Sequence, residues 1–427
     1  MTDMHVSGTT PARSATEADE WRRGWRTVVY GSVGYGSGVM LFQQTGGLFM
    51  DPVERATGLS TTQVTIMPIV TLLYGLASPA VAWLVTGRGP RFAAVTGLAA
   101  LAGLLTVLAA VPFHQATYYL VAALIGVFGS LTYLVPFTHA AAARFSRGVG
   151  KAMGVIGSGA SWLPALATPL IAFVIAEYGW RAGYALIAGI MLFVALPSAL
   201  AGLRPDPRDG SGAHAPDGAA KGRAARGSGG PRVAGSARYW IVVAPFALVA
   251  FMATGVLQSM QSMLLRDGRS LTVATTMTTL VLVGAVAGRI LGGVLLDLFS
   301  RHAVAVAVFA VGTAGCLALA NLERLPAPAI GAAALAIGVC VGCEGDFIGY
   351  FLLKEYGRGR FTHAFGVSQV VCTVGAATGP LAFSSLKDLT GSYVAAAYAG
   401  AGVVAVAALL VAAVRVAAAA TEAPADA

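Results

Sequence analysis

Long apolar segments constrain the fold of this sequence more than any other feature. Twelve stretches of about 18 or more mostly apolar residues follow one another, which is the length that an α-helix needs to cross a bilayer. They lie near residues 25–50, 61–86, 92–111, 116–143, 149–176, 180–203, 239–264, 271–298, 303–320, 329–353, 361–386 and 392–416. A backbone in lipid must satisfy its own hydrogen bonds, so these segments predict an all-α membrane protein with twelve transmembrane helices.

The composition agrees with a chain that is mostly surrounded by lipid. Of its 427 residues, 56% are hydrophobic and only 11% are charged. Soluble proteins carry about 25% charged residues, so a water-soluble multidomain protein is excluded. The net charge of +9 lies mainly in the predicted loops, where it indicates membrane topology rather than nucleic-acid binding.

The distribution of Lys and Arg predicts the orientation in the membrane. When both termini are placed in the cytoplasm, the inner segments carry 21 of these residues and the outer loops carry six. Cytoplasmic loops are enriched in positive charge, so we expect both termini to be cytoplasmic. Residues 1–24 contain no apolar region of a cleavable signal peptide. We expect a multi-pass protein of a bacterial inner (cytoplasmic) membrane.

A polar stretch divides the twelve segments into two sets of six. Residues 204–238 are rich in Gly, Ala, Pro and Arg and have no hydrophobic periodicity, which is typical of a flexible linker. We therefore expect five parts: a cytoplasmic tail at 1–24, a bundle at 25–203, a cytoplasmic linker at 204–238, a second bundle at 239–416 and a cytoplasmic tail at 417–427.

The two sets of six segments match each other when the chain is shifted by 212 residues. Ile125-Gly126-Val127 then falls on Ile337-Gly338-Val339, and Lys151-Ala-Met-Gly-Val155 falls on His363-Ala-Phe-Gly-Val367. Tyr178-Gly179 likewise falls on Thr390-Gly391. One shift that serves three places indicates parallel six-helix repeats, an architecture of transporters whose site lies between the repeats near the bilayer midplane.

Several loops resemble those of the major facilitator superfamily. The turn Gly87-Arg88-Gly89-Pro90-Arg91 resembles its signature loop, although the usual acidic residue is missing, and Gly288-Arg-Ile-Leu-Gly-Gly-Val-Leu-Leu-Asp297 with Arg301 is closer to the pattern. Gly24-Trp25, Tyr178-Gly-Trp-Arg181 and Asp388-Leu-Thr-Gly-Ser-Tyr393 resemble the monocarboxylate porter and oxalate–formate antiporter branch. The resemblance covers the chain outside the tails and linker. It implies two pseudo-symmetric six-helix bundles, with Arg88, Arg91, Asp297 and Arg301 as a conformational motif.

Three ionisable residues lie well inside predicted spans, namely Arg289, Glu344 and Asp346. Each costs about 2.5–3.5 kcal/mol to insert, so each needs an explanation. Arg289 cannot give up its charge and requires an anion. In related carriers an Arg on this span holds the substrate carboxylate, so the resemblance implies the same role for Arg289. The alternative is a permanent salt bridge to span ten.

Glu344 and Asp346 are two residues apart on span ten, so they point about 200° apart on a helix. They cannot both face one partner. We expect one of them to pair with Arg289 while the other, which we take to be Glu344, carries a proton; a purely structural role for both is the alternative. Span eleven holds no second cation beyond its entry, so charge counting favours a monoanion as substrate.

Neutral polar residues in the cavity-lining spans complete the predicted site. The candidates for substrate binding beside Arg289 are Tyr35, Gln258, Tyr30, Tyr133 and Gln369. Apolar pockets with a few polar groups are what small ligands need, although interhelical hydrogen bonding would explain the same residues.

These features predict a secondary active transporter that moves a small organic anion, specifically a monocarboxylate, by proton symport or by anion exchange (antiport). A proton-coupled efflux pump for lipophilic compounds is the main alternative, and a sensor on the same scaffold is another. The sequence holds no H-E-x-x-H, G-x-S-x-G or nucleotide-binding loop, so we do not expect an enzyme. We expect no cofactor, no metal and no nucleic-acid partner, and we expect a monomer in the lipid bilayer.

Overall fold

The structure is a computed structural model that describes residues 17–145, 149–203 and 236–422. Most of the predicted linker 204–238 and parts of both predicted tails lie outside the described residues. The division of the chain into those five parts therefore stays a prediction. All regular secondary structure in the described ranges is helical, as the sequence predicts.

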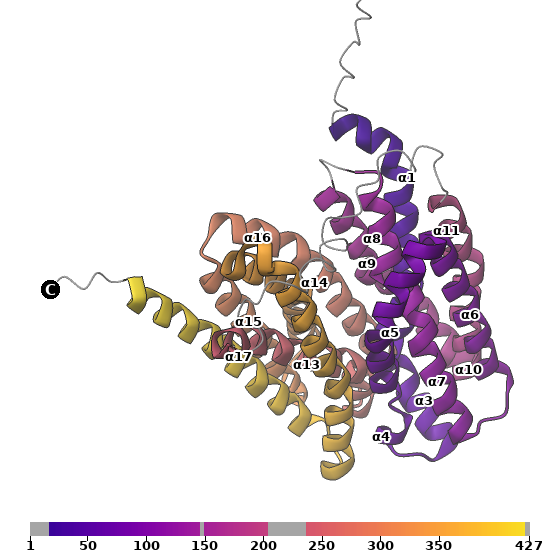
Figure 1. Ribbon diagram of the computed structural model, residues 1–427. Helices are drawn as coiled ribbons and strands as arrows, with labels where there is room; N and C mark the ends of the chain where they lie inside the picture. Colours follow the sequence, from indigo (N-terminus) through magenta and orange to yellow (C-terminus); the bar gives the residue numbers. More distant parts are fainter. Residues whose placement is uncertain (1–16, 146–148, 204–235, 423–427) are drawn as a thin grey trace, which may run out of the picture.

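The first half of the chain forms a bundle around one hydrophobic core that runs from Val28 to Leu203 (Figure 1). Its elements are α1 (Glu17–Gly36), α2 (Val39–Thr45), α3 (Gly47–Thr57), α4 (Thr61–Val64), α5 (Met67–Arg88), α6 (Pro90–Ala110), α7 (Gln115–Gly129), η1 (Ser130–Thr132), α8 (Leu134–Ala142), α9 (Val149–Tyr178), α10 (Trp180–Ile190), η2 (Met191–Ala195) and α11 (Leu196–Gly202).

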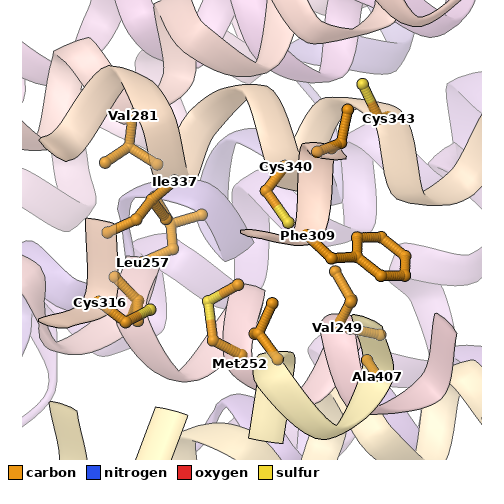
Figure 2. Packing of buried hydrophobic residues seen from close by; sticks show 14 of the residues in the cluster. Val249, Met252, Leu257, Val281, Phe309, Cys316, Ile337, Cys340, Cys343 and Ala407 are labelled. Carbon is orange, nitrogen blue, oxygen red and sulfur yellow. The ribbon is translucent and has the colours of Figure 1, made fainter. Parts of the chain in front are cut away.

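The second half forms another bundle, whose core gathers side chains between Tyr239 and Val411 together with Ala165 of α9. Its elements are α13 (Ala237–Arg266), α14 (Leu271–Leu298), α15 (Arg301–Leu319), η5 (Leu322–Arg324), α16 (Ala327–Thr390) and α17 (Val394–Glu422). Figure 2 shows this core, where Cys316, Cys340 and Cys343 lie among apolar side chains. The four cysteines are all free and buried, as expected for small buried residues.

Ten helical segments in the described ranges are long and apolar enough to cross a membrane. The predicted first span, 25–50, is instead broken into α1, α2 and α3. At the first break, the Val39 N–H donates to the Thr132 hydroxyl at 3.0 Å, and a side chain at Gly38 would meet the same threonine. Hydropathy cannot report this break, because its hydrogen-bond partner is a distant residue. The predicted second span, 61–86, is divided between α4 and α5.

Residues 354–360, between the predicted spans ten and eleven, are helical and lie inside α16. The chain nevertheless reverses within this helix. The Tyr239 and Thr254 hydroxyls of α13 donate to the carbonyl groups of Ala364 and Ala376, so this part of α16 runs in the direction of α13. The part before it follows α14, which runs the opposite way. Two separate spans result, Ala327–Tyr356 and Val367–Thr390.

The two halves use equivalent residues in equivalent ways. Gly179 and Gly391, which match under the shift of 212, have φ angles of 84° and 75° and end α9 and α16. Their N–H groups donate to Ile175 and Lys387 at 2.9 and 2.8 Å. A positive φ angle favours glycine over other residues, which explains why glycine occurs at both matched positions.

The two bundles together have two ends, and different helix termini lie at each. We call the end where α1 begins, α11 ends and α13 begins the linker end, because residues 204–235 join the halves there. The opposite end, which holds α3, α4 and the C-terminal end of α16, is the far end. The halves meet at the far end through side chains of α3 and α4 against α13 and α16.

Candidate substrate site

Arg289 lies at the middle of the seam between the halves. It is half-buried on α14 of the second half, and its Nη1 donates to the Gly157 carbonyl of α9 in the first half at 2.8 Å. Its Nε is buried and has no hydrogen-bond partner. None of the ion pairs among the described side chains involves Arg289. The cation therefore meets a neutral group of the opposite half and retains an unused donor.

Three tyrosines from the first half surround this position. The rings of Tyr35 (α1) and Tyr133 meet edge to face with centroids 5.7 Å apart, and Tyr74 (α5) stacks on Tyr133 at 4.9 Å. The hydroxyl of Tyr133 forms hydrogen bonds with those of Tyr35 and Tyr74. Arg289 lies close enough to Tyr35 and Tyr133 to interact with both electrostatically. The phenol groups thus form a hydrogen-bonding wall beside the cation.

A break in the predicted fourth span positions Tyr133. The residue has an extended backbone between the η1 turn and α8. Pro136 follows in the first turn of α8 and cannot donate to the carbonyl of Thr132, which favours an interruption there. The Thr132 hydroxyl donates to Gly129 at 2.9 Å and accepts the N–H of Val39. The same threonine therefore stabilises the breaks in spans one and four.

Glu344 of α16 also lies close to two of these tyrosines. It is half-buried, forms a hydrogen bond with the Cys372 thiol, and interacts electrostatically with Tyr74 and Tyr133. The side chain of Asp346 lies outside the described side chains, so its predicted role stays a prediction. We call Arg289, Glu344, Tyr35, Tyr74 and Tyr133 the central cluster.

Two glutamines extend the central cluster towards the far end. Gln43 forms hydrogen bonds with Tyr74 and, at 3.2 Å, with the Thr71 hydroxyl. Gln258 of α13 donates from Nε2 to the Gln43 carbonyl and is 3% exposed. A polar network therefore links the second half to the first through Gln258, one of the predicted residues.

Tyr30 and Gln369 are the two remaining predicted substrate contacts. The Cβ of Tyr30 lies against Gly202 of α11, so the structure does not bring Tyr30 to the central cluster. Gln369 lines a cavity of about 460 Å³ that it shares with Tyr74, Tyr133, Thr138 and Thr373. The cavity lies between α5, α8 and the second part of α16.

A family model described as the Major Facilitator Superfamily matches residues 35–380 of the chain. The chain belongs to this superfamily. A search of curated protein sequences returned no match. The match, together with the ten apolar spans, makes the protein a multi-pass membrane protein and a secondary transporter that acts on a small molecule.

At the linker end of this major facilitator protein, an ion-pair cluster includes Arg301, one of the residues expected in the conformational motif. Arg301 pairs with Glu355 at 3.3 Å and lies over the Phe351 ring at 5.4 Å. Arg238 at the start of α13 also pairs with Glu355, so one carboxylate joins three helices. Glu355 was not predicted, although an acidic residue at the end of an apolar span is a visible signal.

The other predicted residues of the motif lie apart from this ion pair or outside the described side chains. Arg88 is exposed and lies over the Phe92 ring at 5.1 Å, within the first half. Arg91 is half-buried in the first turn of α6. The side chain of Asp297 lies outside the described side chains. The structure therefore joins Arg301 to a partner, and it does not bring the described side chains of Arg88, Arg91 and Arg301 together.

At the far end, charged residues of the two halves pair with each other. Arg266 lies 3.2 Å from Asp51 and 3.0 Å from Glu54, and Lys387 lies 3.1 Å from Glu54. Asp388 accepts the N–H of Thr62 at 2.9 Å. We call Asp51, Glu54, Arg266, Lys387 and Asp388 the latch. The sequence analysis did not predict it.

The environment of Glu54 keeps its carboxylate ionised. Burial works against the charged form, but hydrogen bonds from Thr61 and Lys387 and the charge of Arg266 outweigh it. The pKa of Glu54 therefore lies below its ordinary value of 4.5. Next to the latch, the Thr65 and Ser384 hydroxyls are hydrogen-bonded at 2.8 Å, so the halves are in direct contact at the far end.

Proposed function

We propose that this transporter moves a small organic monocarboxylate by alternating access and that Arg289 binds the substrate's carboxylate. The single observation that carries the proposal is that the guanidinium of Arg289 uses only part of its hydrogen-bonding capacity. Arg289 donates to one backbone carbonyl while its buried Nε has no partner. Charged donors in a low-dielectric site gain most from an anion, and a guanidinium matches a carboxylate geometrically.

The position of Arg289 suits a step in which the halves move. Its partner Gly157 belongs to the opposite half, so the contact must change when the halves rock against each other. A carboxylate bound there would touch both halves in one state. The predicted resemblance to monocarboxylate and oxalate–formate carriers supports the same role. One cation in the central cluster favours a monoanion.

Glu344 is the proposed proton carrier, with Asp346 as the second candidate. Its described neighbours include the thiol of Cys372, to which it is hydrogen-bonded, and the phenol groups of Tyr74 and Tyr133, with which it interacts electrostatically. Protonation of this carboxylate would leave the charge of Arg289 in excess and would favour an anion. Exchange of one anion for another remains the alternative coupling mode.

We further propose that the linker end faces the cytoplasm of a bacterial inner membrane, because positive charge is concentrated in the segments on that side. The latch then closes the pathway on the outer side. On this proposal, the structure represents a state that is closed to the outside.

The experiment that tests the proposal is uptake of radiolabelled lactate, pyruvate, aromatic acids, oxalate and succinate into proteoliposomes, with and without an inward proton gradient. We expect saturable uptake of a monocarboxylate. Arg289→Ala should lower kcat/KM about 100-fold, because losing a buried charge contact costs about 2–5 kcal/mol. Arg324→Ala, at an exposed arginine, is the matched control. Unchanged apparent affinity in Arg289→Ala would refute the role of Arg289.

The coupling proposal has its own readout, the pH dependence of uptake in Glu344→Gln and Asp346→Asn. The variant that lacks the proton carrier should lose stimulation by a proton gradient and retain exchange of substrate for substrate. If both variants keep the wild-type pH profile, neither residue carries the coupling proton.

A proton-coupled efflux pump for lipophilic compounds is the second candidate function. The mainly apolar lining of the cavity beside Gln369 favours it. The central Arg289 argues against it, because a lipophilic cation would be repelled there. If no carboxylate is taken up under any gradient while a lipophilic dye is exported, the efflux function replaces the first proposal.

A further inference from the structure

The cavity next to the central cluster has an uneven chemical lining. Its volume of about 460 Å³ falls in the range of sites for small organic ligands, about 300–1,000 Å³. Apolar side chains form most of the wall: Leu72, Leu76, Leu134, Val135, Phe365, Val370 and Val374. The polar groups are few and uncharged, namely Thr138, Gln369, Thr373 and the two tyrosine hydroxyls. Such a lining suits an apolar body and offers no counter-charge.

The cavity shares a wall with the cation site. Tyr74 and Tyr133 line the cavity with stacked rings, and the Tyr133 hydroxyl belongs to the network beside Arg289. Tyr133 therefore belongs both to the wall of the cavity and to the surroundings of Arg289.

The helices on either side of the cavity touch within its wall. A side chain at Gly75 of α5 would lie 2.8 Å from the Thr373 methyl group of α16. The hydrogen bond between Thr65 and Ser384 closes the same seam further along. Towards the linker end, Phe365 lines the cavity beside Ala364, which contacts the start of α13.

The rim of the cavity reaches the outer surface of the bundle. Leu76 and Val370 line it and are 75% and 63% exposed, far more than a closed pocket would allow. On α5 and α16 these residues continue rows of exposed apolar side chains, Leu72 with Leu76 and Val370 with Val374. Such rows are expected to face lipid, so the cavity is accessible to an apolar molecule at the bilayer's side.

We propose that this cavity binds the apolar body of the substrate while Arg289 holds its carboxylate, so that the substrate is an amphipathic monocarboxylate with an aromatic or medium-length aliphatic body. The inference rests on the proposed function of Arg289. It deepens that function, because a two- or three-carbon acid would leave the cavity empty. The carboxylate supplies binding through charge, and the body supplies selectivity through buried apolar area.

The test compares acids of increasing length as competitors of uptake and as stabilisers of the purified transporter against heating. Acetate, butyrate, hexanoate, octanoate and 3-phenylpropionate form the series. In the wild type, apparent affinity should rise about fourfold with each added methylene until the cavity is filled. A flat series, in which acetate binds as well as hexanoate, overturns the inference.

The variant Val370→Trp fills the cavity from its exposed rim, where an indole ring needs little rearrangement. It should bind hexanoate and 3-phenylpropionate at least tenfold more weakly than the wild type and keep its affinity for acetate. Leu381→Trp is the matched control, because Leu381 is an exposed residue of the same helix that does not line the cavity. Equal losses for short and long acids in Val370→Trp would also overturn the inference.

Failure of this inference differs from failure of the proposed function. If short acids are taken up, Arg289→Ala abolishes uptake, and affinity is independent of length, only the cavity's role is wrong. If no acid of any length is transported or stabilises the protein, the carboxylate function itself is wrong. Thermal stabilisation keeps the test valid for a variant that binds without transporting.

Discussion

The latch and the central cluster both bring cations to the seam between the halves, but they satisfy those cations differently. In the latch, Arg266 and Lys387 of the second half meet resident carboxylates of the first half. In the central cluster, the described contacts of Arg289 across the seam are a backbone carbonyl and the phenol groups of Tyr35 and Tyr133, none of which is a carboxylate. The charges of the latch are neutralised when the far end closes, whereas the charge of Arg289 is not.

Charge therefore has two different roles at the seam: paired charges join the halves, and an incompletely paired cation is available to an anion. Ion pairs between the halves join them at the closed far end, where the side chains of Lys387 and Glu54 are 11% and 19% exposed. An incompletely paired cation instead favours a state that contains an anion. A ligand can shift a conformational equilibrium only through such a differential interaction.

The largest expected effect comes from locking the far end closed with a disulfide bond. Thr65→Cys combined with Ser384→Cys places two thiols where the hydroxyls are 2.8 Å apart, close enough for a disulfide after small adjustments. Oxidation should reduce uptake to background, because the far end could no longer open, and reductant should restore it. Each single cysteine variant, treated in the same way, is the control. Full activity of the oxidised double variant would mean that the far end need not open.

A smaller effect is expected from weakening the latch. Glu54→Gln removes the carboxylate shared by Arg266 and Lys387, and partly exposed pairs are worth about 1 kcal/mol, or roughly fivefold in an equilibrium. The far end should open more often, which would raise the labelling rate of a cysteine at Thr65 by a membrane-impermeant maleimide. Glu323→Gln changes an exposed carboxylate near the same end and should leave the rate unchanged. Equal rates in both variants would show that the latch does not hold the far end closed.

The smallest effect is the response of the latch to pH. The pKa of Glu54 is lowered in the folded protein from 4.5, so its ion pairs contribute full stability above about pH 4.5 and lose it as pH falls through the lowered value. The difference in melting temperature between wild type and Glu54→Gln should thus be constant from pH 8 to 5. It should shrink below that range. A difference that grows as pH falls would contradict the assigned direction.

Much of the fold could be predicted from the sequence because lipid exposure leaves a strong hydropathy signal. Hydropathy could not predict the break before Val39 or the continuous helix through residues 354–360. The first depends on a hydrogen bond to the distant hydroxyl of Thr132, which apolar content does not encode. The second lies in a polar stretch, where apolar content gives no signal for a helix.

The candidate site was predictable where a polar side chain interrupts an apolar span, as at Arg289, Glu344 and Tyr133. Tyr74 has the same signal but is not among the predicted residues. Tyr30 is five positions from Tyr35 and therefore points about 140° away from it on a helix. Helical geometry alone separates these two tyrosines, and the structure places Tyr30 against Gly202 instead.

The ion pair between Glu54 and Arg266 has a consequence for how the two halves can be related. These residues are separated by 212 positions, which is the shift that superimposes the repeats, so each is the counterpart of the other. Counterparts that touch must lie beside the pseudo-twofold axis. Two identical halves would place like charges against each other at this point and would repel. An ion pair at this particular point is therefore possible only because the two halves have diverged there, with an acid in one half and a base in the other.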